Sequence, residues 1–273
     1  MELPGGLITE GRLRKDFSFV PLTGDWELFV RELGQRVSGS PQWVTELLFH
    51  SLSSIGGEEV NKARVCALSV GDRQYLLRQL AKLLDDGPHW LTATCRCCEE
   101  PFDLSFSHSQ LPVKEAGEGY PQKTVSLGKH PVSIRVPTGE DQHAISHLSA
   151  ERALDTLLSR LVGCEPSLSI SALSAEQRQQ IETVCEEMAA EISSEIITHC
   201  PHCEAENRID VSPNRFLQRA GQTLLTEVHS IALAYHWDES TILKLPRARR
   251  QTYLNLIDQS RGMRSQSAMG APV

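Results

Sequence analysis

Apolar residues recur at intervals of three and four through most of the first third of the chain, which is the spacing of amphipathic helices. The clearest case is 69–84, where Leu76, Leu80 and Leu83 form one stripe and Asp72 is expected to cap the start of the helix. Alternation of polar and apolar residues over 14–20 predicts a short strand instead. The helices predicted in this part are 24–33, 41–55, 60–66 and 69–84, followed by a strand over 90–94.

The second part of the chain mixes helical and alternating patterns. Two alternating runs, 124–127 and 132–136, lie on either side of a Gly-Lys-His-Pro segment and predict a β-hairpin. Thr138 precedes Asp141 by three positions, and Ser174 precedes Gln177 likewise, which is the capping box that begins a helix. The other predicted elements are helices over 150–162, 175–193, 214–237, 239–245 and 247–257 and a strand over 195–199. Together these elements predict an α+β fold that is mostly helical.

Four of the eight cysteines form two C-x-x-C pairs, Cys95 with Cys98 and Cys200 with Cys203. Two thiolates three residues apart on a tight turn can occupy adjacent corners of a tetrahedron around zinc. A similar short strand follows each pair, which indicates an internal repeat of the zinc-ribbon kind. Within the first pair, Cys97 is an alternative to Cys98 as the second ligand, and both readings remain open.

The two cysteine pairs are separated by residues 99–199, far more than the roughly 15 to 20 of a compact zinc ribbon. Closing so long a loop costs about 5 kcal/mol of chain entropy, whereas structural zinc contributes about 10–16 kcal/mol in small peptides. The expected parts are an N-terminal strand plus helical domain (1–94), the first half of a split zinc ribbon (95–110), an insertion with a small hairpin and helices (111–194), the second half of the ribbon (195–212), C-terminal helices (213–259) and a disordered tail (260–273).

Composition narrows the class of protein. With 27 Lys and Arg against 35 Asp and Glu the net charge is −8, which disfavours sequence-independent binding to nucleic acid. A hydrophobic content of 40% excludes disorder as the main state. No apolar run is long enough for a membrane span and the N-terminus lacks a secretory signal, so a cytoplasmic protein is expected. Motifs of P-loop enzymes, zinc proteases and serine hydrolases are absent from the sequence, and we expect no catalytic residues.

Three arginines, Arg247, Arg249 and Arg250, lie in the first turn of the last predicted helix. The helix dipole disfavours a cation there by about 0.3–1 kcal/mol each, so something must offset it. Solvent together with Glu239 is one explanation, and an acidic patch on a partner subunit is the other. With Trp237, these arginines are the candidate partner-binding residues.

Four stretches in their order along the chain carry a resemblance to a known family. They are 11–24, 68–77, 137–142 and the run 225–254, which includes the segments LTEVHSIA and LPRARRQTYL. With two cysteine pairs between them, the chain resembles the baseplate hub assembly proteins of contractile-tailed bacteriophages and related contractile injection systems. The first cysteine pair departs from the C-P-x-C that such proteins more often carry.

The resemblance implies a protein without catalytic residues or a small-molecule substrate that takes part in building the baseplate. Its partners would be other baseplate or tail proteins, and it would act in the cytoplasm during assembly, away from membranes. It would then either stay in the finished particle or leave as a chaperone. From the cysteine pairs alone, the alternative function is a zinc-ribbon adaptor that binds nucleic acid.

Overall fold

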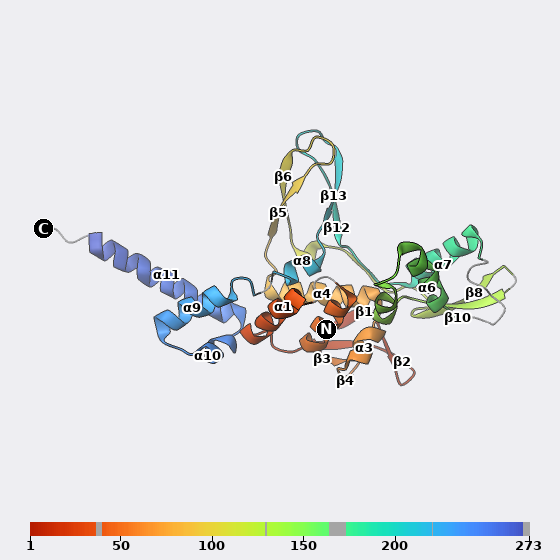
Figure 1. Cartoon of the computed structure of the whole chain (residues 1–273), viewed down its shortest axis with the longest axis horizontal. Coiled ribbons are helices and arrows are strands. Elements are labelled where there is room, and N and C mark those ends of the chain that lie inside the picture. The colour runs from red at the N-terminus through yellow and green to blue at the C-terminus, as the bar shows by residue number, and fades with distance from the viewer. Residues whose placement is uncertain (37–39, 129, 164–172, 220, 270–273) are drawn as a thin grey trace.

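The computed structural model describes residues 1–36, 40–128, 130–163, 173–219 and 221–269. The fold is mixed α+β, with 48% of residues in helices and 26% in strands, so the predicted class is confirmed but a mostly helical chain is not. Figure 1 shows an elongated molecule in which a central body carries a pair of projecting hairpins, an insertion at one end and the C-terminal helices at the other.

A four-stranded antiparallel sheet and four helices form the central body. Helical spacing places Trp43, Leu47, Leu76 and Leu80 on inward faces, where they are fully buried in one core with Leu3 of the sheet. The strands in sheet order are β1 (Glu2–Thr9), β2 (Arg12–Phe19), β3 (Leu52–Ile55) and β4 (Glu58–Glu59). The helices are α1 (Gly24–Arg36), α2 (Pro41–Ser51), α3 (Lys62–Ala67) and α4 (Val70–Leu84).

The body differs from the prediction at three places. The helix expected over 41–55 ends at Ser51, because Leu52 is extended and Leu52–Ile55 pair with β2 as the strand β3. Gly56 and Gly57, with φ angles of 63° and 77°, then form the turn between β3 and β4. The strand β1 was not predicted, since its Pro-Gly-Gly segment is untypical of strands.

The start of α4 is also capped differently from the prediction. Ser69 is the N-cap, and its hydroxyl accepts from the amide of Asp72. Asp72 is instead fully buried, and its carboxylate accepts hydrogen bonds from the amides of Gly5 (2.8 Å) and Gly6 (3.0 Å) in β1. Burial raises the pKa of Asp72. This carboxyl group therefore holds the glycine-rich strand β1 against α4.

The insertion has its own core, formed by apolar residues of a hairpin and two helices, among them Leu127, Ile134 and Ile181. The predicted hairpin and both predicted capping boxes are present. The helix expected over 175–193 ends at Met188, and the chain then pairs as β11 with β7 to close the base of the insertion. A short helix, η1 (His108–Gln110), precedes the insertion, whose elements are β7 (Val113–Lys114), β8 (Gln122–Leu127), β9 (His130–Arg135), α5 (Gly139–Ile145), α6 (Ala150–Leu161), β10 (Val162–Gly163), α7 (Ala175–Met188) and β11 (Glu191–Ile192).

The C-terminal part consists of α8 (Pro213–Leu217), α9 (Leu224–Tyr235), α10 (Glu239–Leu243) and α11 (Arg247–Met269). The single helix expected over 214–237 is thus two helices, because Gly221 has a φ of 75° and lies against the carbonyl of Glu27. The helix α11 continues past 257 through most of the predicted disordered tail, since no proline follows Pro246 to end it before Met269. Among the described residues, no helix is both long and apolar enough to cross a membrane.

Candidate metal centre

Two antiparallel hairpins project together from the central body (Figure 1). The first consists of β5 (His89–Thr94) and β6 (Pro101–Phe106), and the second of β12 (Glu195–His199) and β13 (Glu206–Asp210). In both hairpins the strands pair up to their last residues, so the connecting turn is held rigidly at the tip. Each turn contains one of the two cysteine pairs.

The first turn is shaped by backbone hydrogen bonds around Cys95. Its amide donates to the carbonyl of Glu100 at 3.0 Å, and its carbonyl accepts from the amide of Glu99 at 3.1 Å. Glu99 has a φ of 60°, the left-handed conformation that reverses the chain. The amide of Cys97 then points at the sulfur of Cys95, with N···S at 3.4 Å.

The second turn repeats this geometry around Cys200. Its amide donates to the carbonyl of Ala205 at 3.0 Å, and its carbonyl accepts from the amide of Glu204 at 2.9 Å. Glu204 has a φ of 59°, and the amide of His202 points at the sulfur of Cys200 at 3.4 Å. The internal repeat predicted from the sequence is therefore present in the backbone of both turns.

The two turns bring four sulfur atoms together. Sγ of Cys95 lies 3.6 Å from Sγ of Cys203, and Sγ of Cys98 lies 3.7 Å from Sγ of Cys200. All four sulfur atoms lie within 4.8 Å of one another. Cys97 is exposed and lies outside this cluster, so Cys98 and not Cys97 is the second member of the first pair. The four predicted cysteines could hold one metal ion.

Asn207 connects the two turns and was not predicted from the sequence. Its side chain is 2% exposed, its Oδ1 accepts from the amide of Arg96 at 3.0 Å, and its Nδ2 donates to the carbonyl of Ala205 at 2.8 Å. Nδ2 also lies 3.5 Å from Sγ of Cys95. In β13 this residue occupies the place that Phe102 has in β6, as the second residue after the turn. The only sign in the sequence that Asn207 joins the two turns was a polar residue at a repeat position that is apolar in the first hairpin.

The hydrogen bonds around the cluster favour a thiolate at one position. The amides of Cys98 and Cys97 lower the pKa of Cys95 to about 6, and Asn207 acts in the same direction. The amide of Ala205 would also lower the pKa of Cys203, but the neighbouring thiols, Cys98 first, raise it to about 12. Four thiolates at these distances repel one another, and a bound cation would remove that repulsion.

The predicted partner-binding residues have different surroundings. Arg250 is fully buried, and its guanidinium lies 2.6 Å from the carboxylate of Glu27 and 3.0 Å from that of Glu227. Arg250 is therefore a structural ion-pair residue, and for this arginine the buried carboxylates of Glu27 and Glu227 offset the helix dipole. Trp237 is half-buried, with its ring centroid 5.1 Å from that of Tyr253.

The two remaining arginines of that cluster keep accessible side chains. Arg249 is exposed, and Arg247 is half-buried at the edge of a cavity. Among the described residues, neither forms an ion pair. These two residues, unlike Arg250, can reach a partner.

Comparison with known proteins identifies no relatives. No protein-family profile matches the sequence. No curated protein and no solved structure matches it either. The resemblance to baseplate hub assembly proteins therefore rests on the sequence motifs alone and stays a prediction.

Proposed function

We propose that the chain is a zinc-binding structural protein in which one zinc ion joins the two cysteine hairpins as a split zinc ribbon. Zinc–thiolate bonds of about 2.3 Å in a tetrahedron place neighbouring sulfur atoms about 3.8 Å apart. The Cys95–Cys203 and Cys98–Cys200 distances of 3.6 and 3.7 Å fit that geometry. This agreement is the observation that carries the proposal.

The same ligand set supports a structural rather than a catalytic role. Four thiolates complete the coordination of zinc and leave no position for water or substrate. The ion would act as a cross-link between segments about a hundred positions apart, Cys95 and Cys203 being separated by 108 positions. Because β7 and β11 also pair at the base of the insertion, loss of the ion would loosen mainly the hairpins and not the whole insertion.

We further propose that the protein acts by protein contacts in assembling the baseplate of a contractile tail or injection system. The stretches that carry the family resemblance meet in pairs in the fold. Val70 donates to the carbonyl of Pro137 at 3.0 Å, which joins 68–77 to 137–142, and Gly24 donates to the carbonyl of Leu245 at 3.2 Å, which joins 11–24 to 225–254. These stretches thus lie where the body meets the insertion and the C-terminal helices, as expected for a scaffold.

Two experiments test the two parts of this proposal. Metal analysis of the purified protein should find one zinc per chain in the wild type and in Cys97→Ser, and a large loss in Cys203→Ser. Equal zinc content in the two variants would refute the cysteine assignment. Electron microscopy of cells that lack this chain should show no complete tails or injection particles, and normal particles would refute the role in assembly.

A further inference from the structure

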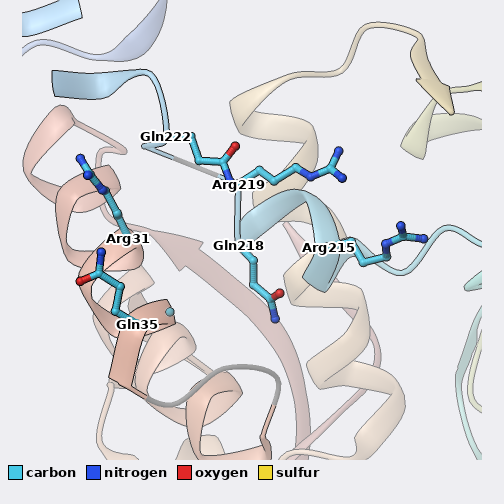
Figure 2. A pocket seen from close by; sticks show the side chains of 7 residues that line it. Arg31, Gln35, Arg215, Gln218, Arg219 and Gln222 are labelled. Atoms are coloured by element: carbon cyan, nitrogen blue, oxygen red, sulfur yellow. The ribbon is translucent and has the colours of Figure 1, made fainter. Parts of the chain in front are cut away.

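A groove between α1 and the segment that begins with α8 gathers positive charge on this acidic protein. Its cavity volume is about 470 Å³. Figure 2 shows Arg31 and Gln35 one helical turn apart on α1, across the gap from the α8 segment. The polar residues that line it are three arginines and three glutamines: Arg31, Arg215, Arg219, Gln35, Gln218 and Gln222. We call it the arginine groove.

The cations of the arginine groove have no carboxylate partners within the described part of the chain. Of the residues that the structure describes, no acidic one lines the groove and none forms an ion pair with Arg31, Arg215 or Arg219. The guanidinium of Arg215 donates to the backbone carbonyl of Asp210, at 3.3 Å. With a net charge of −8, the chain has carboxylates in excess, yet none of the described ones lines the groove. Three arginines without a carboxylate partner along one groove favour an anionic ligand, although Figure 2 shows that the side chains of Arg215 and Arg219 extend away from α1.

The positive surface continues beyond the groove. Arg219 also lines a second cavity of about 230 Å³, together with Arg247 and Trp90. The indole of Trp90 is 72% exposed, which is unusual for a large apolar side chain. Because Arg219 lines both cavities, Arg247, one of the arginines predicted to bind a partner, lies next to the arginine groove. An apolar contact is thus available next to the row of cations.

We propose that the arginine groove binds an acidic segment of a partner protein, with Trp90 contacting an apolar residue of that segment. Guanidinium groups bind carboxylates in a bidentate manner, and glutamine amides can both donate to and accept from a peptide backbone. Nucleic acid fits less well, because no aromatic ring lines the arginine groove on which a base could stack. This inference rests on the proposed function as a protein that acts through protein contacts.

Binding of a fluorescein-labelled decaglutamate peptide, followed by fluorescence anisotropy, tests the proposal on the full zinc-loaded chain. We expect saturable binding of decaglutamate to the wild type. Arg31→Gln and Arg219→Gln should each weaken binding about two- to fivefold, and together about four- to 25-fold, since partly exposed charge pairs contribute up to about one kcal/mol each. Arg12→Gln, an exposed arginine in β2, is the matched control and should bind like the wild type.

A steric variant separates the groove from general electrostatic attraction. Gly34 lines the arginine groove, and a Cβ added there meets no atom within 4 Å. Gly34→Leu should therefore fold normally and block the groove, with at least a tenfold loss of decaglutamate binding at unchanged net charge. Normal thermal unfolding and zinc content of this variant confirm that the fold is intact.

Three results would overturn the proposal. The first is that decaglutamate does not bind to the wild type, and the second is that Gly34→Leu binds it as tightly as the wild type does. The third is that labelled oligo-dT binds more tightly than decaglutamate and depends on the same arginines, which would assign the groove to nucleic acid. Each of these is independent of the test of the proposed function. If the protein binds zinc and is required for particle assembly but does not bind decaglutamate, only the groove proposal is refuted and the proposed function stands.

Discussion

Replacing Arg250 with methionine removes a cation that Glu27 and Glu227 share in the interior of the protein. Arg250 lies in α11, Glu27 in α1 and Glu227 in α9, so the three side chains join the central body to the C-terminal helices. The guanidinium also donates to the carbonyl of Leu245 at 2.8 Å. Methionine has a similar length and keeps the apolar contacts of the arginine stem, so the change isolates the loss of charge and hydrogen bonds.

The size of the effect follows from burial. Arg250 has no exposed side-chain surface, and the side chains of Glu27 and Glu227 are 2% and 7% exposed, so water cannot replace the lost partner. Removing one member of a buried ion pair costs about 3–5 kcal/mol, because the charges left behind stay buried without compensation. For a chain of this size, each kcal/mol lowers the melting temperature by roughly 2–4 °C. We expect a fall of about 6–20 °C for the transition of the C-terminal part.

Thermal and urea unfolding followed by circular dichroism measures this effect. Arg249→Met is the matched control: it is one residue away on the same helix, is exposed, and should change stability by less than about 0.5 kcal/mol. Adding Glu27→Gln and Glu227→Gln to Arg250→Met should restore part of the loss, because no uncompensated charge then remains. Equal stability of Arg250→Met and Arg249→Met would refute this account of the buried ion pairs.

Two further predictions concern a backbone position and a carboxylate. Gly221→Ala should lower stability by about 1–3 kcal/mol in urea unfolding, because its φ is 75° and the new Cβ would lie 2.6 Å from the carbonyl of Glu27, whereas Gly34→Ala should be neutral or stabilising. Burial alone would raise the pKa of Asp141, but hydrogen bonds from Arg135 and other donors hold it well below its usual range. The stability that this carboxylate contributes is present above its unfolded pKa of about 3.9 and is lost as the pH falls further. The urea midpoint of Asp141→Asn should therefore be lower than that of the wild type at pH 6 and change less between pH 6 and pH 3.

Local sequence signals predicted those parts of the fold that local interactions determine. The apolar stripe of α4, the hairpin of β8 and β9 and the two capping boxes all depend on residues a few positions apart. The cysteine pairs belong to the same group, because each turn is built from its own residues. That the two cysteine pairs meet at one site could be predicted only because a structural zinc ion requires four ligands.

Contacts between distant residues decided the features that the sequence did not reveal. β1 is held by a carboxylate more than sixty positions away, through Gly5 and Gly6. Arg250 forms an ion pair with Glu27, which lies 223 positions away in the sequence. A residue expected on the surface is therefore buried. The arginine groove combines α1 with a segment near the other end of the chain, so its charge could not be seen as a cluster in the sequence.

X-ray absorption at the zinc edge, on protein purified without added metal, tests the central claim most directly. We expect one zinc per chain surrounded by four sulfur atoms at about 2.3 Å. Cys203→Ser should lose the ion or show three sulfur atoms, and Cys97→Ser should give the wild-type spectrum. Protein that contains no bound metal, or zinc with nitrogen or oxygen ligands in place of the four thiolates, would contradict the claim that one ion joins the two hairpins.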